Sequence, residues 1–281
     1  MMEPMSIPVL DAIIAHKREE VAALKAVTSF DELEAMVAQQ EPPRNFFAAV
    51  RPGTPHATRV IAEVKRKSPS AGWIRPEYED VSFAPEGIAA QYFEAGAAAV
   101  SCLTDRRFFG GDISYIARIK DRVPLPVLRK DFIVDPWQLW ESRANGADAV
   151  LLIAECLREG ELIDLLILAQ QLGLTALVEV HEMDSLLRVR PHVGFPHPGY
   201  FLLGINNRDL SNMKVDVGHT LRLADLVEDR SVLVSESGIR TLADLVRLRE
   251  AGVQIVLVGE HLMRAEHPGL ALKELLTPEK A

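Results

Sequence analysis

The chain has 281 residues, 48% of them hydrophobic, which is enough for a substantial core and excludes a disordered or fibrous protein. It has 31 Lys and Arg residues and 40 Asp and Glu residues, and the resulting net charge of −9 argues against a general nucleic-acid binder. No apolar stretch approaches the length of a membrane span, the acidic start does not resemble a signal peptide, and two cysteines without ligand spacing indicate a reducing compartment. We therefore expect a cytoplasmic protein with neither a membrane nor a nucleic acid as partner.

Two amphipathic segments come first. Apolar residues recur at helical spacing from about Ile7 to Ala26, which predicts a first helix. A second short helix is predicted from Ser29, a candidate N-cap, to Gln40, and the two prolines that follow end it. We assign residues 1–50 to an N-terminal helical extension.

From Val60 onward, short runs rich in Val, Ile and Leu alternate with amphipathic segments of helical period. Strands are predicted near 59–65, 98–103, 125–130, 148–153, 175–180, 200–206, 231–235 and 254–258. Helices are predicted near 84–95, 112–121, 136–145, 158–172, 182–190, 217–228, 241–251 and 268–276. Eight β-then-α units predict a (β/α)8 TIM barrel, forming one domain with the extension over residues 1–281. A doubly wound open sheet is the alternative, but no glycine-rich loop of the expected kind follows the first strand.

Six of the apolar runs end in a residue suited to chemistry, and this recurrence is the strongest functional signal in the chain. The residues concerned are Glu63 with Lys65, Lys130, Glu179, Asn206, Glu236 and Gly259. Burying a charged or amide group is costly unless it is paired, so such groups at strand ends need a reason. Because active sites of these barrels lie at the carboxyl ends of the strands, the pattern predicts an active site there.

The ionisable residues among them have structural and functional interpretations. Glu63 and Lys65 share one strand face and are expected to pair, either as a rim ion pair or as part of the site. Lys130 would suit a general acid or an amine nucleophile if neighbouring cations or burial lowered its pKa. Glu179 and Glu236 could cap helices, but two carboxylates facing two lysines favour acid–base chemistry.

Other residues indicate a phosphorylated ligand rather than a metal. Arg208 follows Asn206 on the same face, and small turns at Ser237-Gly238 and after the eighth strand place backbone N–H groups where these barrels bind phosphate. His192 and His197 lie in a Pro/Gly-rich loop on the opposite face of the barrel and fit an ordinary surface loop better than a metal site. His181 alone is more typical of a helix start, and no Walker loop, zinc spacing or nicotinamide fingerprint is present.

Several segments together resemble the indole-3-glycerol-phosphate synthases, the barrel lyases of tryptophan biosynthesis. The similar stretches are residues 13–21, 61–72, 127–138, 177–181, 203–210, 234–239 and 257–263. The resemblance covers nearly the whole chain. It implies a phosphorylated substrate, 1-(2-carboxyphenylamino)-1-deoxyribulose 5-phosphate, which closes into a ring with loss of carbon dioxide and water. It implies no cofactor, because recovery of aromaticity drives the decarboxylation.

The resemblance also implies roles for individual residues. Lys130 matches the general acid that protonates the ribulose carbonyl, and Lys65 matches the lysine beside the anthranilate carboxylate, which can also assist as a proton donor. Glu179 matches a carboxylate of the later proton transfers, with Asn206 holding either this carboxylate or the substrate hydroxyls. Glu63 and Glu236 match the remaining site carboxylates. The implied substrate-binding positions are Ser68, Phe109, Phe132, Arg208, Ser237, Gly238, Gly259 and Glu260. Glu260 stands where some members have serine, which leaves only its backbone for the phosphate.

Two alternatives remain open. A sugar-phosphate isomerase of the same pathway, phosphoribosylanthranilate isomerase, typically uses a cysteine and an aspartate, but Cys102 lies near the end of the second strand rather than the first. A non-catalytic phosphate-binding barrel would use Arg208 and the glycine turns, and would have no need for the lysines and carboxylates. We expect a monomer or a weak homo-oligomer.

Overall fold

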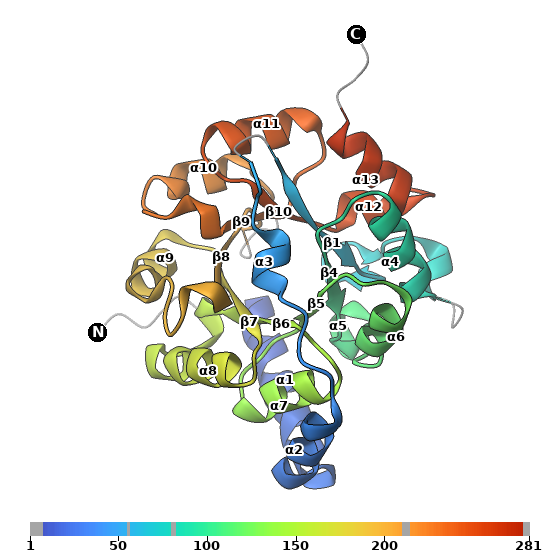
Figure 1. Ribbon diagram of the computed structural model, residues 1–281, viewed down its shortest axis with the longest axis vertical. Coiled ribbons are helices and arrows are strands. Elements are labelled where there is room, and N and C mark those ends of the chain that lie inside the picture. Colours follow the sequence, from blue (N-terminus) through green and yellow to red (C-terminus); the bar gives the residue numbers. More distant parts are fainter. Residues whose placement is uncertain (1–7, 55–56, 80–82, 210–213, 278–281) are drawn as a thin grey trace.

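The computed structural model describes residues 8–54, 57–79, 83–209 and 214–277. Eight parallel strands close into a barrel (Figure 1). They are β1 (Arg59–Val64), β4 (Ala99–Leu103), β5 (Val127–Lys130), β6 (Ala149–Ile153), β7 (Thr175–Val180), β8 (Phe201–Asn206), β9 (Leu233–Glu236) and β10 (Ile255–Val258). The ring is closed because β1 pairs on both sides, with Ile61 opposite Ala99 in β4 and opposite Leu257 in β10. The predicted (β/α)8 barrel is confirmed.

Helices surround the barrel, and each predicted helix is present (Figure 1). They are α4 (Pro85–Glu94), α6 (Tyr115–Arg122), α7 (Pro136–Ala144), α8 (Glu159–Gln171), α9 (Met183–Val189), α10 (Gly218–Ala224), α11 (Leu242–Glu250) and α13 (Pro268–Leu276). The helix predicted to reach residue 228 stops at Ala224, because the N–H groups of Leu226 and Val227 bond three residues back and tighten the chain into turns. Short helices α5 (Arg106–Phe109) and α12 (Glu260–Arg264) and a hairpin of β2 (Lys67–Ser68) with β3 (Gly72–Trp73) were not predicted.

The two faces of the strands pack into different cores. Outward residues such as Val100 and Val178 pack against the helices, while inward ones such as Ile61 and Leu128 fill the barrel. Helix α3 (Phe46–Val50) packs its phenylalanines into the interior cluster and covers the amino-terminal end of the barrel. The Pro/Gly-rich loop of residues 190–199 ends in η4 (Pro198–Tyr200), which packs against α3, so this end is the predicted far face. The carboxyl-terminal end of the barrel is therefore left for a site.

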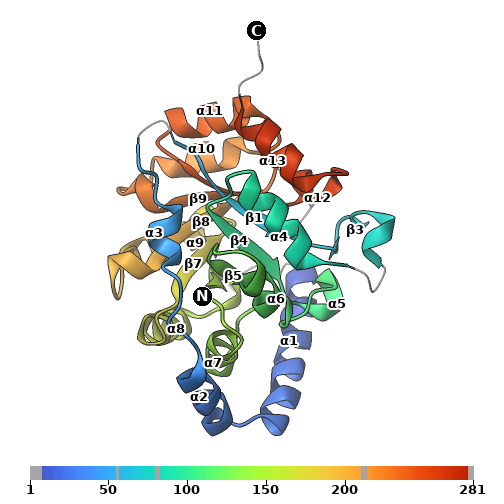
Figure 2. The ribbon, with the colours of Figure 1, turned by 45° about the vertical axis from the view of Figure 1, so that its right-hand side comes forward.

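The extension consists of α1 (Pro8–Val27) and α2 (Phe30–Gln39), and Figure 2 shows α1 passing beside α5 on its way to α2. Ser29 is the predicted N-cap: its hydroxyl accepts from the Glu32 N–H, and the Glu32 side chain reaches back to the Ser29 N–H. The Trp137 indole of α7 donates to the Thr28 carbonyl over 3.0 Å, which anchors the connection between the two helices. Residues 1–7 of the predicted extension lie outside the described part of the chain. Among the described helices, none is long and apolar enough to cross a membrane.

Candidate active site

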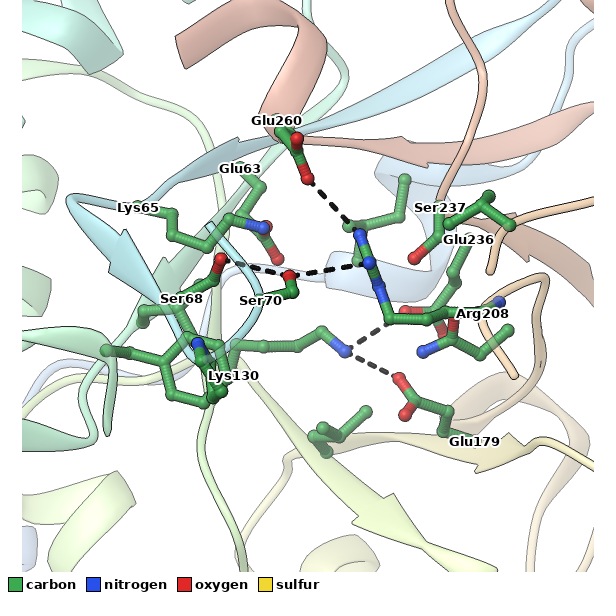
Figure 3. Close-up of a pocket in the computed structure, with 18 of the residues that line it drawn as sticks. Glu63, Lys65, Ser68, Ser70, Lys130, Glu179, Arg208, Glu236, Ser237 and Glu260 are labelled. Atoms are coloured by element: carbon green, nitrogen blue, oxygen red, sulfur yellow. Dashed lines mark hydrogen bonds and ion pairs between the residues drawn. The ribbon is translucent and has the colours of Figure 1, made fainter. Parts of the chain in front are cut away.

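A cavity of about 180 Å³ opens at the carboxyl-terminal end of the barrel, and all eight strands contribute to its wall (Figure 3). Every residue that the sequence assigned to the site lines it. These residues are Glu63, Lys65, Ser68, Phe109, Lys130, Phe132, Glu179, Asn206, Arg208, Glu236, Ser237, Gly238, Gly259 and Glu260. The alternation of strand side chains brings the strand-end residues there: Lys130 follows the inward Leu128 by two positions, and Glu179 follows the inward Leu177 in the same way.

Lys130 lies at the centre of a buried charge cluster. Its ammonium donates to Glu179 Oε2 over 2.6 Å and lies 3.1 Å from Glu236 Oε2. Burial disfavours the ammonium, but the charges of Glu179, Glu236 and Glu63 outweigh it and raise the pKa of Lys130 above its ordinary value. The condition under which the sequence favoured an amine nucleophile, a lowered pKa, is therefore not met, because carboxyl groups rather than cations surround this lysine. Lys130 is therefore a charged donor at neutral pH.

The two carboxylates beside Lys130 are held in different protonation states. Burial would raise the pKa of Glu179, but Lys130 and His181 lower it to about 2, so Glu179 is ionised. Burial and the nearby Glu179 charge raise the pKa of Glu236 well above its usual range. Two carboxylates sharing one ammonium cannot both ionise cheaply, and the opposite pKa shifts favour the negative charge on Glu179. The site thus holds a carboxylate base, a neutral carboxylic acid and a cationic acid together.

Glu63 and Lys65 form the pair expected from the sequence. Lys65 Nζ lies 2.6 Å from Glu63 Oε1, and both side chains line the cavity rather than an outer rim. Gly259 allows this arrangement, since a Cβ at position 259 would overlap the Glu63 carboxylate. The glycine therefore serves the packing of the site as well as its turn.

His181 is a residue that sequence reasoning missed. The sequence predicts a helix-start residue without partners, but the imidazole lies between Glu155 of η2 (Ala154–Cys156) and Glu179, 3.2 Å from each. The imidazole is almost fully buried and borders the cavity. The available signal was its spacing of two residues from Glu179, which puts both on the inward face.

The opposite wall of the cavity carries the residues expected to hold phosphate. Asn207 donates to the Ser237 carbonyl over 3.0 Å and supports the turn, where Ser237 and Gly238 have φ of 68° and 82°. The Asn206 amide oxygen accepts from the backbone N–H of Arg208, two positions further on, over 3.1 Å. A non-glycine residue in the left-handed region is uncommon and marks a constrained turn.

Glu260 contributes a side chain as well as a backbone. Its carboxylate lies 3.2 Å from Arg208 Nη2 and also pairs with Arg264 over 2.9 Å, and Figure 3 shows Arg208 between Glu260 and Ser70. Burial would raise the pKa of Glu260, but Arg264, Lys65 and Arg208 lower it. An ionised acid therefore stands beside the guanidinium expected to bind phosphate.

The remaining wall is apolar. The rings of Phe109 and Phe132 lie 6.0 Å apart, and Val9, Leu10 and Ile13 of α1 complete the lining. The sequence does not predict that these α1 residues line the cavity, because the apolar periodicity of a helix shows which of its faces is buried but not where the helix docks on the barrel. Ser68 is buried, and its hydroxyl accepts from the Ala71 N–H over 3.1 Å, which supports the β2–β3 hairpin.

Within the described ranges, no group of three or more His, Cys, Asp or Glu side chains could hold a metal ion. His192 pairs with Glu159 over 2.9 Å, and His197 accepts from the Gly199 N–H over 3.0 Å, so these two histidines have separate local partners.

A closed barrel with acids, lysines and glycine turns around one carboxyl-terminal cavity defines a (β/α)8-barrel protein built for acid–base chemistry on a small anionic ligand. Residues 10–275 match the family model for indole-3-glycerol phosphate synthase. The chain belongs to this family.

Curated relatives agree with this placement, and solved structures agree with the fold. An indole-3-glycerol phosphate synthase of Acidithiobacillus ferrooxidans is 45% identical over 271 residues, covering 95% of this chain and 98% of the relative. One of Rhodopirellula baltica is 44% identical over 269 residues, with coverage of 95% and 98%. A crystal structure of 3-hexulose-6-phosphate synthase has a TM-score of 0.58 at 14% identity, covering 77% of this chain and 97% of that chain. The tryptophan synthase alpha subunit of Legionella pneumophila has a TM-score of 0.52 at 14% identity, with coverage of 86% and 96%. These two structures share only the fold.

Proposed function

We propose that the cavity binds 1-(2-carboxyphenylamino)-1-deoxyribulose 5-phosphate and converts it to indole-3-glycerol phosphate, carbon dioxide and water. This is the activity that gives the family its name, a carbon–carbon lyase step of tryptophan biosynthesis. The observation that carries the proposal is the Lys130 ammonium held 2.6 Å from an ionised Glu179 inside the cavity.

Substrate binding divides between the two walls of the cavity. Arg208 and the turns at Ser237-Gly238 and Gly259-Glu260 offer a guanidinium and backbone N–H groups to the phosphate. Phe109 and Phe132 offer ring faces to the anthranilate. Lys65 supplies a charge for the anthranilate carboxylate.

The chemistry follows from the protonation states around Lys130. Its ammonium protonates the ribulose carbonyl oxygen as the aromatic carbon attacks the carbonyl carbon, and a cation there also stabilises the developing negative charge. Loss of carbon dioxide then restores the aromatic ring. Glu179, an ionised carboxylate, accepts the proton lost during dehydration, and Asn206, Glu63 and Glu236 complete the polar lining.

The proposal is tested by following the indole chromophore as the purified protein turns over the carboxyphenylamino sugar phosphate. Lys130→Ala should lower kcat by at least about a thousandfold while substrate binding changes by less than about tenfold, because the ammonium acts mainly in the transition state. Lys25→Ala is the matched control, since Lys25 pairs with Asp135 at the exposed surface of α1. No product from the native protein, or a variant that loses binding but keeps its rate, would refute the proposal.

Two features weigh against the alternatives. Cys102 points into the outer core rather than the cavity, and burial raises the pKa of its thiol, so it is not placed for isomerase chemistry. A barrel that only binds phosphate has no use for Lys130, Glu179 and Glu236 in contact, because burying an ion pair beside a third ionisable group is costly without a reaction to serve.

We further propose that the enzyme acts in the cytoplasm as a monomer or weak homo-oligomer, and that residues 1–281 form one domain. The free cysteines support a reducing compartment, and α1 supports a single domain because it lines the cavity. Light scattering at several concentrations tests the oligomeric state, and a single cooperative urea transition tests the domain.

A further inference from the structure

The proposed reaction consumes one proton in each turnover. The carbonyl oxygen leaves as water and so takes up two protons, while the ring carbon next to nitrogen gives up only one. The substrate carboxylate leaves as neutral carbon dioxide, and its bonding electron pair stays in the ring. One proton must therefore reach the reacting oxygen from the protein or the solvent.

Lys130 and Glu179, the residues proposed to act at this oxygen, cannot provide that proton by themselves. Lys130 gives its proton in the ring closure and becomes a neutral amine, which must be charged again. Glu179 lies in contact with Lys130 but is ionised at the start of the turnover, and the proton that it accepts during dehydration goes to the departing hydroxyl, so it has none left to give to Lys130. A substrate in the cavity also stands between this pair and the bulk solvent.

His181 is placed to supply the missing proton. Its Nε2 lies 3.2 Å from Glu179 Oε1, while the other oxygen of the same carboxylate lies 2.6 Å from Lys130 Nζ. Glu179 thus joins the imidazole to the ammonium through its two oxygens. On its far side, the imidazole has Nδ1 3.2 Å from Glu155 Oε2, and the His181 backbone N–H donates to Glu155 Oε1 over 2.8 Å.

The surroundings keep a proton on this imidazole. Burial disfavours the imidazolium, but Glu155 and Glu179 together outweigh burial and the Lys130 charge, and they raise the pKa of His181. Among the described residues, His219 of α10 also contacts it, through an Nε2 that lies 2.8 Å from the His181 carbonyl oxygen. A histidine that only needed to fill space would not require a carboxylate on each nitrogen.

We infer that His181, held by Glu155, is the proton reservoir that recharges Lys130 through Glu179 during each turnover. This inference depends on the proposed lyase reaction. The Nε2–H bond breaks as a proton joins Glu179 Oε1; a proton leaves Glu179 Oε2 as one joins the Lys130 amine. The carboxylate returns to its ionised state and His181 is left neutral, with its Nδ1–H donated to Glu155. After product leaves, Nε2 takes one proton from water in the cavity, which His181 borders. Protons and charge balance, and no other reactant is needed.

The test compares three variants in steady-state assays between pH 6 and 9. In His181→Gln the amide can still donate to Glu179 but carries no transferable proton, so kcat should fall about ten- to a hundredfold while KM changes less than about twofold. The solvent deuterium isotope effect on kcat should rise, because proton delivery becomes limiting. In Glu155→Gln the imidazolium loses its stabilising charge, so the alkaline decline of kcat should begin at lower pH than in the native enzyme.

His192→Gln is the matched control, because His192 pairs with Glu159 outside the cavity. It should leave kcat, KM, the isotope effect and the pH profile unchanged. A native-like circular dichroism spectrum confirms that each variant is folded. If His181→Gln does not fold, the pH profile of Glu155→Gln tests the inference instead. The inference is overturned if folded His181→Gln keeps its kcat and isotope effect, or if only KM changes. A native protein that forms no indole product would instead refute the proposed function itself.

Discussion

Lys130 and Glu179 lie 49 positions apart in the chain, yet the Lys130 ammonium donates to Glu179 Oε2 over 2.6 Å. Glu236 lies on the other side of the same ammonium, 3.1 Å away. One cation between two unlike carboxylates makes the two acids inequivalent, and this gives the first prediction.

Glu179→Gln and Glu236→Gln should differ sharply. Glu179 is ionised, so an amide at position 179 removes a base and a charge, and kcat should fall at least about a hundredfold. Glu236 has a raised pKa and is neutral, so glutamine resembles its working form and kcat should fall less than about tenfold. Steady-state rates at pH 7.5 check both variants. Equal losses would contradict the assigned protonation states.

Glu260→Gln should strengthen substrate binding. The change removes a negative charge that competes with phosphate for Arg208, so KM should fall about two- to fivefold, as expected for a partly exposed ion pair. Glu161→Gln is the control, because Glu161 pairs with Arg158 away from the cavity and should leave KM unchanged. A higher KM in Glu260→Gln would show that the carboxylate itself helps to hold the substrate.

Gly204→Ala should damage the site through packing. A Cβ at position 204 would overlap the Glu236 carboxylate and press on Leu177, so we expect a loss of about 1–3 kcal/mol in the free energy of unfolding and a lower kcat. Gly160→Ala is the control, since no atom lies within 4 Å of a Cβ there and the residue is in α8. Urea denaturation should show that Gly160→Ala is as stable as the native protein or slightly more so. Equal stability of the two variants would mean that the strand shifts freely.

Two lysines of α1 should contribute very differently to stability. Lys17 is 2% exposed and lies 2.9 Å from Asp105 and 3.0 Å from Asp131, so Lys17→Met should cost about 3 kcal/mol by leaving Asp105 buried without its cation. Lys25 forms an exposed pair with Asp135, and Lys25→Met should cost less than about 1 kcal/mol. Urea midpoints measure both. Similar costs would show that Lys17 is not an anchor of the extension.

Asp131 should make the fold sensitive to acid. Burial would raise its pKa, but Arg129 and Lys17 lower it to about 2 from 3.8, so the folded state holds the carboxylate more strongly than the unfolded chain does. This stabilisation, on the order of 2 kcal/mol, is complete above about pH 4 and is lost as the pH falls towards 2. Unfolding free energies from pH 6 to 2 should fall less steeply in Asp131→Asn. An unchanged slope would refute the assignment.

Much of the fold and of the site could be read from the sequence because the relevant signals are local. A strand that is buried on both faces and a helix that is buried on one face have different periods of apolar residues. The Ser29 and Glu32 side chains that cap α2 are only three positions apart in the chain. Polar residues two positions after inward apolar ones had to point into the barrel mouth, which placed Glu63, Lys130 and Glu179 correctly.

Tertiary structure decided the properties that depend on distances between residues of different strands, such as pKa shifts and ion pairs. The pKa of Lys130 rises because acidic side chains of three other strands surround it, and His181 has two acidic neighbours because Glu155 lies on the turn that follows β6. The apolar wall supplied by Val9, Leu10 and Ile13 likewise depends on how α1 docks, which Lys17 secures against two aspartates of the barrel. Local periodicity determines which face a side chain occupies, whereas its charge state depends on through-space fields that only the closed barrel creates.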